Sequence, residues 1–190
     1  MLQLKEKVIE ILESTKFVVV TGGKESNLVA LVRSEQLKLL FPSALNLVAI
    51  KFELDEESSP VSFTYNLIEQ KWINPHKEMI PENKRKFKLS KIYEIKRQIY
   101  EVTRIRNPDY IILEIPNNLK DQLTLDIIEA VKEMEEEIGK ENFLFVHIEN
   151  TPHLKPEEQE KEKMKGLEFL SATGIKPNLL IKEHEITWVH

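Results

Sequence analysis

The stretch that decides the fold is KFVVVTGGKESNLVALVRSEQLKLL, residues 16–40. Residues 17–21 form an apolar and β-branched run, which is typical of a buried parallel strand. Two glycines follow this run, and residues 27–41 then place apolar side chains at helical spacing until Pro42. A buried strand, a glycine turn and a helix are the parts of a phosphate-binding loop. The stretch therefore predicts an α/β fold and raises the question of whether a phosphate group binds here.

The rest of the chain continues this alternation of strands and helices. Further buried strands are expected at residues 47–54, 109–115, 142–148 and 179–181, and helices at 3–14, 89–106, 121–138 and 156–173. Weaker alternation at residues 61–65 and 71–73 predicts a hairpin. Strands that alternate with helices form a mostly parallel sheet with helices on both faces. Because 190 residues suit one domain, we expect a single α/β domain over residues 1–190.

Composition excludes several classes of protein. Hydrophobic residues make up 41% of the chain and charged residues 31%, which favours a globular core over disorder. A formal net charge of -5 disfavours nucleic-acid binding. The absence of cysteine excludes disulfides, thiolate metal sites and cysteine nucleophiles. Because no apolar run approaches the ~20 residues needed to span a bilayer, and no signal peptide is visible, we expect a cytoplasmic protein.

One edge of the predicted sheet gathers the candidate binding residues. In parallel sheets, ligands bind beyond the carboxyl ends of the strands. That rule places Gly22, Gly23, Lys51, Glu114 and Asn117 on one rim.

The second half of the chain resembles a known family. Residues 107–155, NPDYIILEIPNNLKDQLTLDIIEAVKEMEEEIGKENFLFVHIENTPHLK, resemble the synthetase domain of CTP synthases, in which a strand ends as VEVGGTVGDIES and a later turn reads LGREN. In this resemblance Glu114 falls on the strand-end glutamate of the family. The tail LSATGIKPNLLI, residues 170–181, is similar to SIGIQPDILI. The best match covers residues 107–182, and the glutamine-hydrolysing domain of the family has no counterpart.

The first half resembles the family more loosely. FVVVTGG, residues 17–23, is similar to YIFVTGG, Ser26 falls within the following loop of the family, and Lys51 falls on a family lysine. The resemblance implies a P-loop NTPase-like fold, shared with dethiobiotin synthetase and ParA-like ATPases. It further implies a role in pyrimidine metabolism, a nucleoside triphosphate with Mg²⁺ as candidate ligand, and assembly into a homodimer or other homo-oligomer.

The phosphate loop departs from the family pattern. A working loop needs glycines whose N–H groups approach the phosphates, and a lysine that pairs with their oxygens. The glycine-lysine-glycine of the family is replaced here by Val29-Ala30-Leu31. Valine restricts the backbone and alanine removes the cation, so this is a degenerate Walker A loop. Lys24 lies nearby and is a candidate to replace the missing lysine.

The magnesium and uridine sites also depart from the pattern. The acidic segment of the family falls in a divergent and shortened region, residues 55–88, which leaves Glu114 as a lone carboxylate. Such a group holds Mg²⁺ poorly, so Glu114 is either a weak metal ligand or a rim carboxylate. The KTKPTQ segment of the family becomes residues 159–164, QEKEKM, in which Lys161 is retained and Met164 replaces the glutamine.

Three hypotheses for the function follow. The first is a non-catalytic relative, a pseudoenzyme, that serves as a binding or regulatory module and has no catalytic residues. The second is a small nucleotide-dependent ligase or phosphotransferase in which Lys24, Lys51 and Glu114 rebuild a site. The third is a protein-interaction scaffold that binds no nucleotide. The candidate nucleotide-binding residues are Gly22, Gly23, Lys24, Ser26, Lys51 and Lys161, and the candidate metal ligand is Glu114.

Other signals are less specific. His147 is interpreted as a strand-end residue of the fold, and the glutamate-rich run 133–137 as the solvent-facing side of a helix. The basic cluster at residues 84–88 is either a solvated loop or a binding patch for acidic partners. Trp72 and Trp188 are either ordinary packing or part of an interface.

Overall fold

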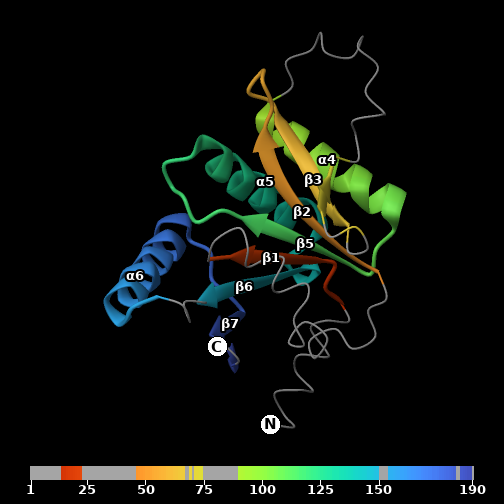
Figure 1. The fold of residues 1–190 in the computed structure, drawn as a ribbon. Helices are drawn as coiled ribbons and strands as arrows, with labels where there is room; N and C mark the ends of the chain where they lie inside the picture. The colour runs from red at the N-terminus through yellow and green to blue at the C-terminus, as the bar shows by residue number, and fades with distance from the viewer. Residues whose placement is uncertain are drawn as a thin grey trace.

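The fold is built around one sheet. The computed structural model describes residues 14–22, 46–66, 69, 71–74, 90–149, 154–182 and 185–189. Within these residues eight strands form a sheet in the order β4-β3-β2-β5-β1-β6-β7-β8 (Figure 1). The strands are β1 (Phe17–Thr21), β2 (Leu47–Leu54), β3 (Pro60–Asn66), β4 (Lys71–Ile73), β5 (Tyr110–Ile115), β6 (Phe143–Glu149), β7 (Leu179–Lys182) and β8 (Glu185–Trp188).

The central strands run parallel and the edges run antiparallel. β2, β5, β1, β6 and β7 are joined by parallel ladders. β3 pairs antiparallel with β2, and β4 with β3. At the other edge β8 pairs antiparallel with β7. All five residues of β1 are buried, as expected for an apolar strand in the middle of a sheet whose two faces are covered.

Three α-helices lie within the described residues: α4 (Lys91–Arg106), α5 (Gln122–Ile138) and α6 (Pro156–Thr173). Their ends follow ordinary capping chemistry. The Ser90 hydroxyl accepts a hydrogen bond from the Tyr93 N–H at the start of α4, and the Asp121 carboxylate accepts one from the Leu123 N–H at the start of α5. Gly174 ends α6 at a φ of 71°, a left-handed conformation that suits glycine.

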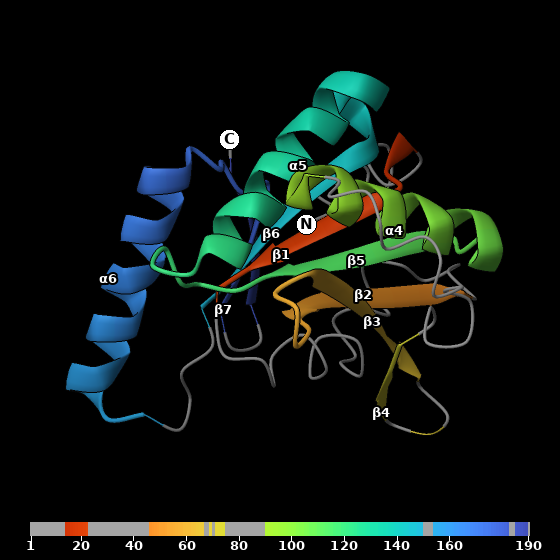
Figure 2. The same cartoon turned by 90° about the horizontal axis from the view of Figure 1, so that it is seen from above.

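The sheet separates two apolar clusters. On what we call the helical face, Val19, Ile50 and Leu113 pack with the buried sides of α4 and α5, and Phe169 of α6 joins this cluster. Figure 2 shows α4 and α5 together on this side of the sheet. On the opposite face, Val20 packs with other strand residues and with partly buried Trp72.

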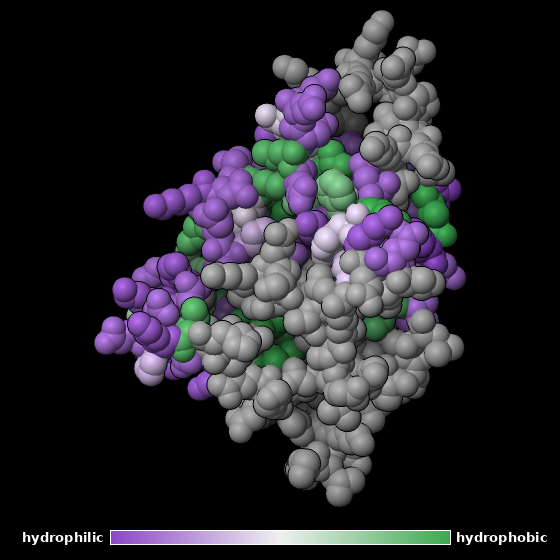
Figure 3. Space-filling model, viewed as in Figure 1, coloured by the Kyte–Doolittle hydropathy of each residue, from purple (hydrophilic) through white to green (hydrophobic). Residues whose placement is uncertain are grey.

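α6 is attached to the fold along a narrow strip. Only Gly166, Phe169 and Thr173 of this helix are buried. In the space-filling view, the visible side of α6 at the left is mostly hydrophilic (Figure 3), although Met164 and Leu167 of this helix are also exposed. None of the described helices is both long and apolar enough to cross a membrane.

The expected fold class is confirmed. The sheet is mostly parallel, and the predicted hairpin is present as β3 and β4. The predicted helices at residues 3–14 and 27–41 lie outside the described residues. The sequence pattern predicts the last strand at residues 179–181, whereas the structure adds β8 after it.

Residues 185–188 lack the apolar run by which the central strands were predicted. β8 is an edge strand, where polar residues are tolerated.

Candidate functional site

The rim predicted from the sequence is formed by the carboxyl ends of β1, β5 and β6. The ladders pair Thr21 of β1 with Ile115 of β5 on one side and with His147 of β6 on the other. Gly22 follows Thr21 with a φ of 84°, which turns the chain away from the sheet in a conformation that suits glycine. The start of the candidate phosphate loop therefore lies directly beside His147.

His147 is buried at this rim. Only 2% of the residue is exposed, and its Nδ1 lies 2.9 Å from the Thr21 hydroxyl oxygen. Burial lowers the pKa of His147 below its ordinary value, although nearby Glu149 acts in the opposite direction. The ring is therefore neutral at neutral pH. A side chain so enclosed holds elements together and does not meet a ligand from solvent.

Two glycines make room for the His147 ring. A Cβ added at Gly22 would lie 2.8 Å from the ring Cε1 and 2.5 Å from the Ile148 carbonyl oxygen. A Cβ added at Gly166 of α6 would lie 2.9 Å from the ring Nε2. Both distances are below normal contact, so the imidazole fills the space between the start of the loop and α6. His147 thus links the carboxyl end of β1 to the helix that carries Lys161.

Local sequence patterns do not predict this link. They indicate a strand-end residue at His147 and a loop residue at Gly22, but they relate neither of them to Gly166. A signal was present, since Gly166 is an unfavourable residue in the interior of a charged helix. A glycine in such a place indicates close approach of another group.

Lys51 is held by other groups on the opposite face of the sheet. Its Nζ lies 2.9 Å from a carboxylate oxygen of Glu53 and 4.9 Å from the centre of the Trp72 ring. The ring of Phe63 is 6.0 Å from the same nitrogen. Only 13% of the Lys51 side chain is exposed. The amine is thus directed along its own strand and toward β3 and β4, where an aromatic ring and a carboxylate stabilise its charge.

Trp72 has a packing role. Its ring meets the Tyr65 ring edge to face, with 5.2 Å between the centres. The other tryptophan considered above, Trp188, lies in β8, where the structure describes the backbone only.

Glu114 lies next to Lys51 in the sheet. The ladder between β2 and β5 pairs Ile50 with Leu113, and continuing this register by one residue sets Lys51 beside Glu114. Paired residues of parallel strands point to the same face of the sheet. Glu114 is also paired with Val20 of β1, whose side chain lies on the face away from α4 and α5. Lys51 and Glu114 therefore both belong to that face. Glu114 is partly buried. The two residues are thus backbone neighbours on the same face of the sheet, near the end of β1.

No ready-made metal site accompanies Glu114 in the described part of the chain. No group of three histidine, aspartate or glutamate side chains there could hold a metal ion. A single carboxylate can bind Mg²⁺ when phosphate oxygens and water complete the coordination. By itself, without further ligands from the described residues, Glu114 does not form a metal site.

Lys161 is exposed on α6, five residues before Gly166. Five residues of helix span about 7.5 Å, so Lys161 lies more than one turn from the contact with His147. Asn117 lies in the loop after β5 and is partly buried. The remaining candidates, Gly23, Lys24 and Ser26, lie outside the described residues.

The sequence was compared with known proteins and protein families. A family model described as CTP synthase N-terminus matches residues 90–188, which is more than half of the chain. The chain belongs to the CTP synthase N-terminal family. This result confirms the family resemblance inferred above from residues 107–182.

Curated CTP synthases match the same region. One from Desulfitobacterium hafniense (strain Y51) is 37% identical over 98 residues, which cover 50% of this chain and 18% of that protein. One from Carboxydothermus hydrogenoformans is 31% identical over 94 residues, 48% of this chain and 18% of that protein. One from Caldanaerobacter subterraneus subsp. tengcongensis is 32% identical over 95 residues, 49% of this chain and 18% of that protein. The match thus spans less than a fifth of each relative.

The region shared with CTP synthases contains only part of the candidate site. Glu114, His147 and Lys161 lie within residues 90–188. Gly22, at the start of the phosphate loop, and Lys51 lie before it. The shared region therefore includes the link between β6 and α6, whereas the assignment of the loop residues rests on the sequence pattern alone.

Proposed function

We propose that this chain is a non-catalytic, single-domain member of the CTP synthase N-terminal family that acts in the cytoplasm as a binding or regulatory module. The observation that carries the proposal is the position of Lys51. In the family resemblance Lys51 falls on a family lysine and is a candidate for nucleotide binding, yet its amine pairs with Glu53 and lies over the Trp72 ring. Using it for a phosphate would require breaking both contacts.

The sequence of the loop supports the same conclusion. Val29 and Ala30 replace the glycine and lysine that a phosphate loop uses. Met164 replaces the glutamine in the segment that corresponds to the uridine-reading part of the family. Changes at separate places, each of which weakens a different step, are expected in a relative that has lost turnover.

The test is an assay of CTP formation from UTP, ATP and ammonia, with Mg²⁺ present. Ammonia supplies the amino nitrogen directly, so the assay does not depend on glutamine hydrolysis. We expect no CTP above the level of a protein-free control, and steady formation of CTP would refute the proposal. An authentic CTP synthase assayed under the same conditions is the positive control.

A calorimetric titration then separates a nucleotide-binding module from a scaffold. ATP, UTP and CTP are titrated separately, with and without Mg²⁺. Binding that requires Mg²⁺ would indicate a retained triphosphate site, and binding without Mg²⁺ would indicate a nucleotide sensor. Failure of all three nucleotides to bind would leave the scaffold, for which a protein partner is the next target.

One observation favours the ligase or phosphotransferase as a second candidate. Lys51 and Glu114 lie side by side on the same face, close to the end of β1. If they form a rebuilt site with Lys24, the protein should hydrolyse ATP, and both Glu114→Ala and Lys24→Ala should abolish hydrolysis. Glu56→Ala, in the exposed turn after β2, is the matched control. Absence of hydrolysis in the unmodified protein would exclude this candidate.

We further propose that the chain forms a homo-oligomer, as the family resemblance implies. Nucleic acid is not a proposed partner, because the net charge of -5 would oppose binding to phosphates along a backbone.

A further inference from the structure

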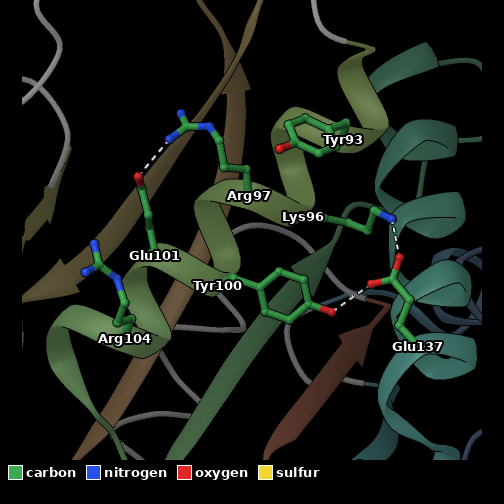
Figure 4. A pocket seen from close by; sticks show the side chains of 7 residues that line it. All are labelled: Tyr93, Lys96, Arg97, Tyr100, Glu101, Arg104 and Glu137. Atoms are coloured by element: carbon green, nitrogen blue, oxygen red, sulfur yellow. Dashed lines mark hydrogen bonds and ion pairs between the residues drawn. The ribbon is translucent and has the colours of Figure 1, made fainter.

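The outer side of α4 carries an alternating stripe of tyrosine and arginine. Tyr93, Arg97, Tyr100 and Arg104 follow one another at intervals of four, three and four residues, which keeps them on one side of a helix. They line an open hollow of about 340 Å³ together with Lys96, Glu101 and Glu137 (Figure 4). Tyr93 is 50% exposed, although it is a large aromatic residue. We call these four residues the α4 stripe.

Contacts with neighbouring residues hold two members of the stripe, Arg97 and Tyr100, in place. The Arg97 guanidinium is paired with Glu94 and lies 2.9 Å from a Glu101 carboxylate oxygen. The Tyr100 hydroxyl donates to Glu137 of α5 at 3.0 Å. Burial and this hydrogen bond raise the pKa of Tyr100 to about 12, so the phenol stays neutral at all ordinary pH values. Side chains that are ordered before association lose less conformational entropy when they bind.

Lys96 forms the boundary between the stripe and α5. Its amine pairs with Glu137 of α5 (Figure 4). It also lies 2.6 Å from a carboxylate oxygen of Glu133. These hydrogen bonds raise the pKa of Lys96, Glu133 contributing most, and they keep the amine charged. The surface beside the stripe therefore presents fixed charges of both signs.

The stripe is complementary to itself when it is reversed. A two-fold axis through the point between residues 98 and 99 would set Tyr93 opposite Arg104 of a second copy. The same axis would set Arg97 opposite Tyr100. In the stripe every tyrosine thus meets a guanidinium group, and no two like charges face each other.

The charged neighbours obey the same symmetry. The axis sets Lys96 opposite Glu101 of the second copy, so that opposite charges meet again. A uniformly acidic partner would be repelled by Glu94 and Glu101, which lie beside the arginines. A second copy of the same chain satisfies both the aromatic and the charged positions.

We propose that α4 packs antiparallel against α4 of a second copy of this chain, about a two-fold axis between residues 98 and 99. The proposal deepens the homo-oligomer named under the proposed function and rests on it. Such an interface is isologous, because each copy uses the same surface. Tyrosine and arginine are the residue types that dominate binding energy at protein interfaces, and guanidinium groups stack on aromatic rings.

The size of the helix sets the expected strength. α4 has 16 residues and is therefore about 24 Å long, which places the interface at the small end of specific protein contacts. We expect a monomer–dimer equilibrium at micromolar concentration, visible by sedimentation velocity as a sedimentation coefficient that rises with concentration.

The first experiment uses two variants that complement each other. Arg97→Glu/Arg104→Glu would set glutamate opposite tyrosine, and Tyr93→Arg/Tyr100→Arg would set arginine opposite arginine. Each variant alone should self-associate about a hundredfold more weakly or not at all. An equal mixture of the two should associate again, because each new glutamate then faces a new arginine.

The control keeps the charge change and moves it elsewhere. Lys163→Glu/Lys165→Glu changes two exposed cations of α6 in the same way and should leave self-association unchanged. A monomeric unmodified protein at submillimolar concentration would overturn the proposal. An equal effect of the α6 control, or two folded variants that fail to associate in the mixture, would also overturn it. Circular dichroism of each variant shows whether α4 is retained.

A second experiment does not depend on charge. The chain contains no cysteine, so Tyr93→Cys/Arg104→Cys has two thiols only. These positions are eleven residues apart, about 16 Å along the helix, which is too far for a disulfide within one copy. Mild oxidation should give a covalent dimer, whereas Lys161→Cys/Ala172→Cys, with the same spacing on α6, should not. No excess of dimer over this control would contradict the proposed arrangement.

The outcome is separable from that of the proposed function. CTP formation and nucleotide titration are measured on the monomeric Arg97→Glu/Arg104→Glu variant as well as on the unmodified protein. If sedimentation and crosslinking show no α4 interface, the nucleotide results on the unmodified protein are not affected. Formation of CTP would refute the proposed function without bearing on the sedimentation result.

Discussion

Replacing Gly166 with alanine should destabilise the protein, although alanine normally stabilises the interior of a helix. The usual gain from glycine to alanine is ~1 kcal/mol. Here the new methyl carbon would lie 2.9 Å from Nε2 and 3.1 Å from Cε1 of His147. The ring cannot retreat, because Gly22 and the Thr21 hydroxyl enclose it on other sides. Overpacking of this kind costs ~1–3 kcal/mol, so we expect a net loss of ~1 kcal/mol.

The assay is urea denaturation followed by circular dichroism, with a double-mutant cycle. When His147→Ala removes the ring, Gly166→Ala should become stabilising by ~1 kcal/mol. Lys165 is the exposed neighbour of Gly166. The difference in stability between Lys165→Gly and Lys165→Ala measures the helix preference for alanine where no packing contact interferes. If Gly166→Ala stabilises the unmodified protein as much as the Lys165 pair predicts, the ring does not occupy the space described here.

Three further predictions concern stability. As the pH falls below 6.5, the free energy of unfolding should decrease. Burial lowers the pKa of His147, so in this range the unfolded chain binds a proton that the folded chain does not. Urea denaturation at several pH values measures this, and His147→Asn should flatten that part of the stability–pH curve. Gln98→Leu should lower the free energy of unfolding by ~1–3 kcal/mol, because it removes two buried hydrogen bonds. The Gln98 amide oxygen accepts from the Ser62 N–H and its NH₂ group donates to the Pro60 carbonyl, each at 2.7 Å. An unchanged urea midpoint would contradict this prediction. Asp121→Ala should cost ~1 kcal/mol by removing the cap of α5, whereas Glu129→Ala on its exposed side should have little effect in the same measurement.

The elements of the fold were predictable because their signals are local. β1 at residues 17–21 and β2 at residues 47–54 have the bounds expected from their apolar runs. α6 begins at Pro156 and ends before Gly174, two residues whose backbone preferences mark helix ends. Each of these boundaries depends on a few neighbouring residues, so a single sequence is enough to find it.

The contacts between elements were not predictable in the same way. The glutamates of residues 133–137 were expected to face solvent, yet Glu133 pairs with Lys96 of α4. This pairing exists because α4 and α5 pack side by side, which no local pattern of α5 reveals. The pair of Lys51 and Glu53 is of the local kind, since both residues lie in β2 and residues two apart in a strand share a face.

The order of the strands in the sheet has a consequence for synthesis on the ribosome. β1 and β2 are made first, but β5 lies between them, so they have no direct ladder to form with each other. The partners of Phe17 are Ile111, about half the chain length away, and Phe143, about two thirds away. Only the antiparallel strands β2, β3 and β4 can pair early, through short connections. The most apolar strand therefore waits without a partner until β5 leaves the exit tunnel, and this interval is when the nascent chain is most exposed to aggregation and most in need of a chaperone.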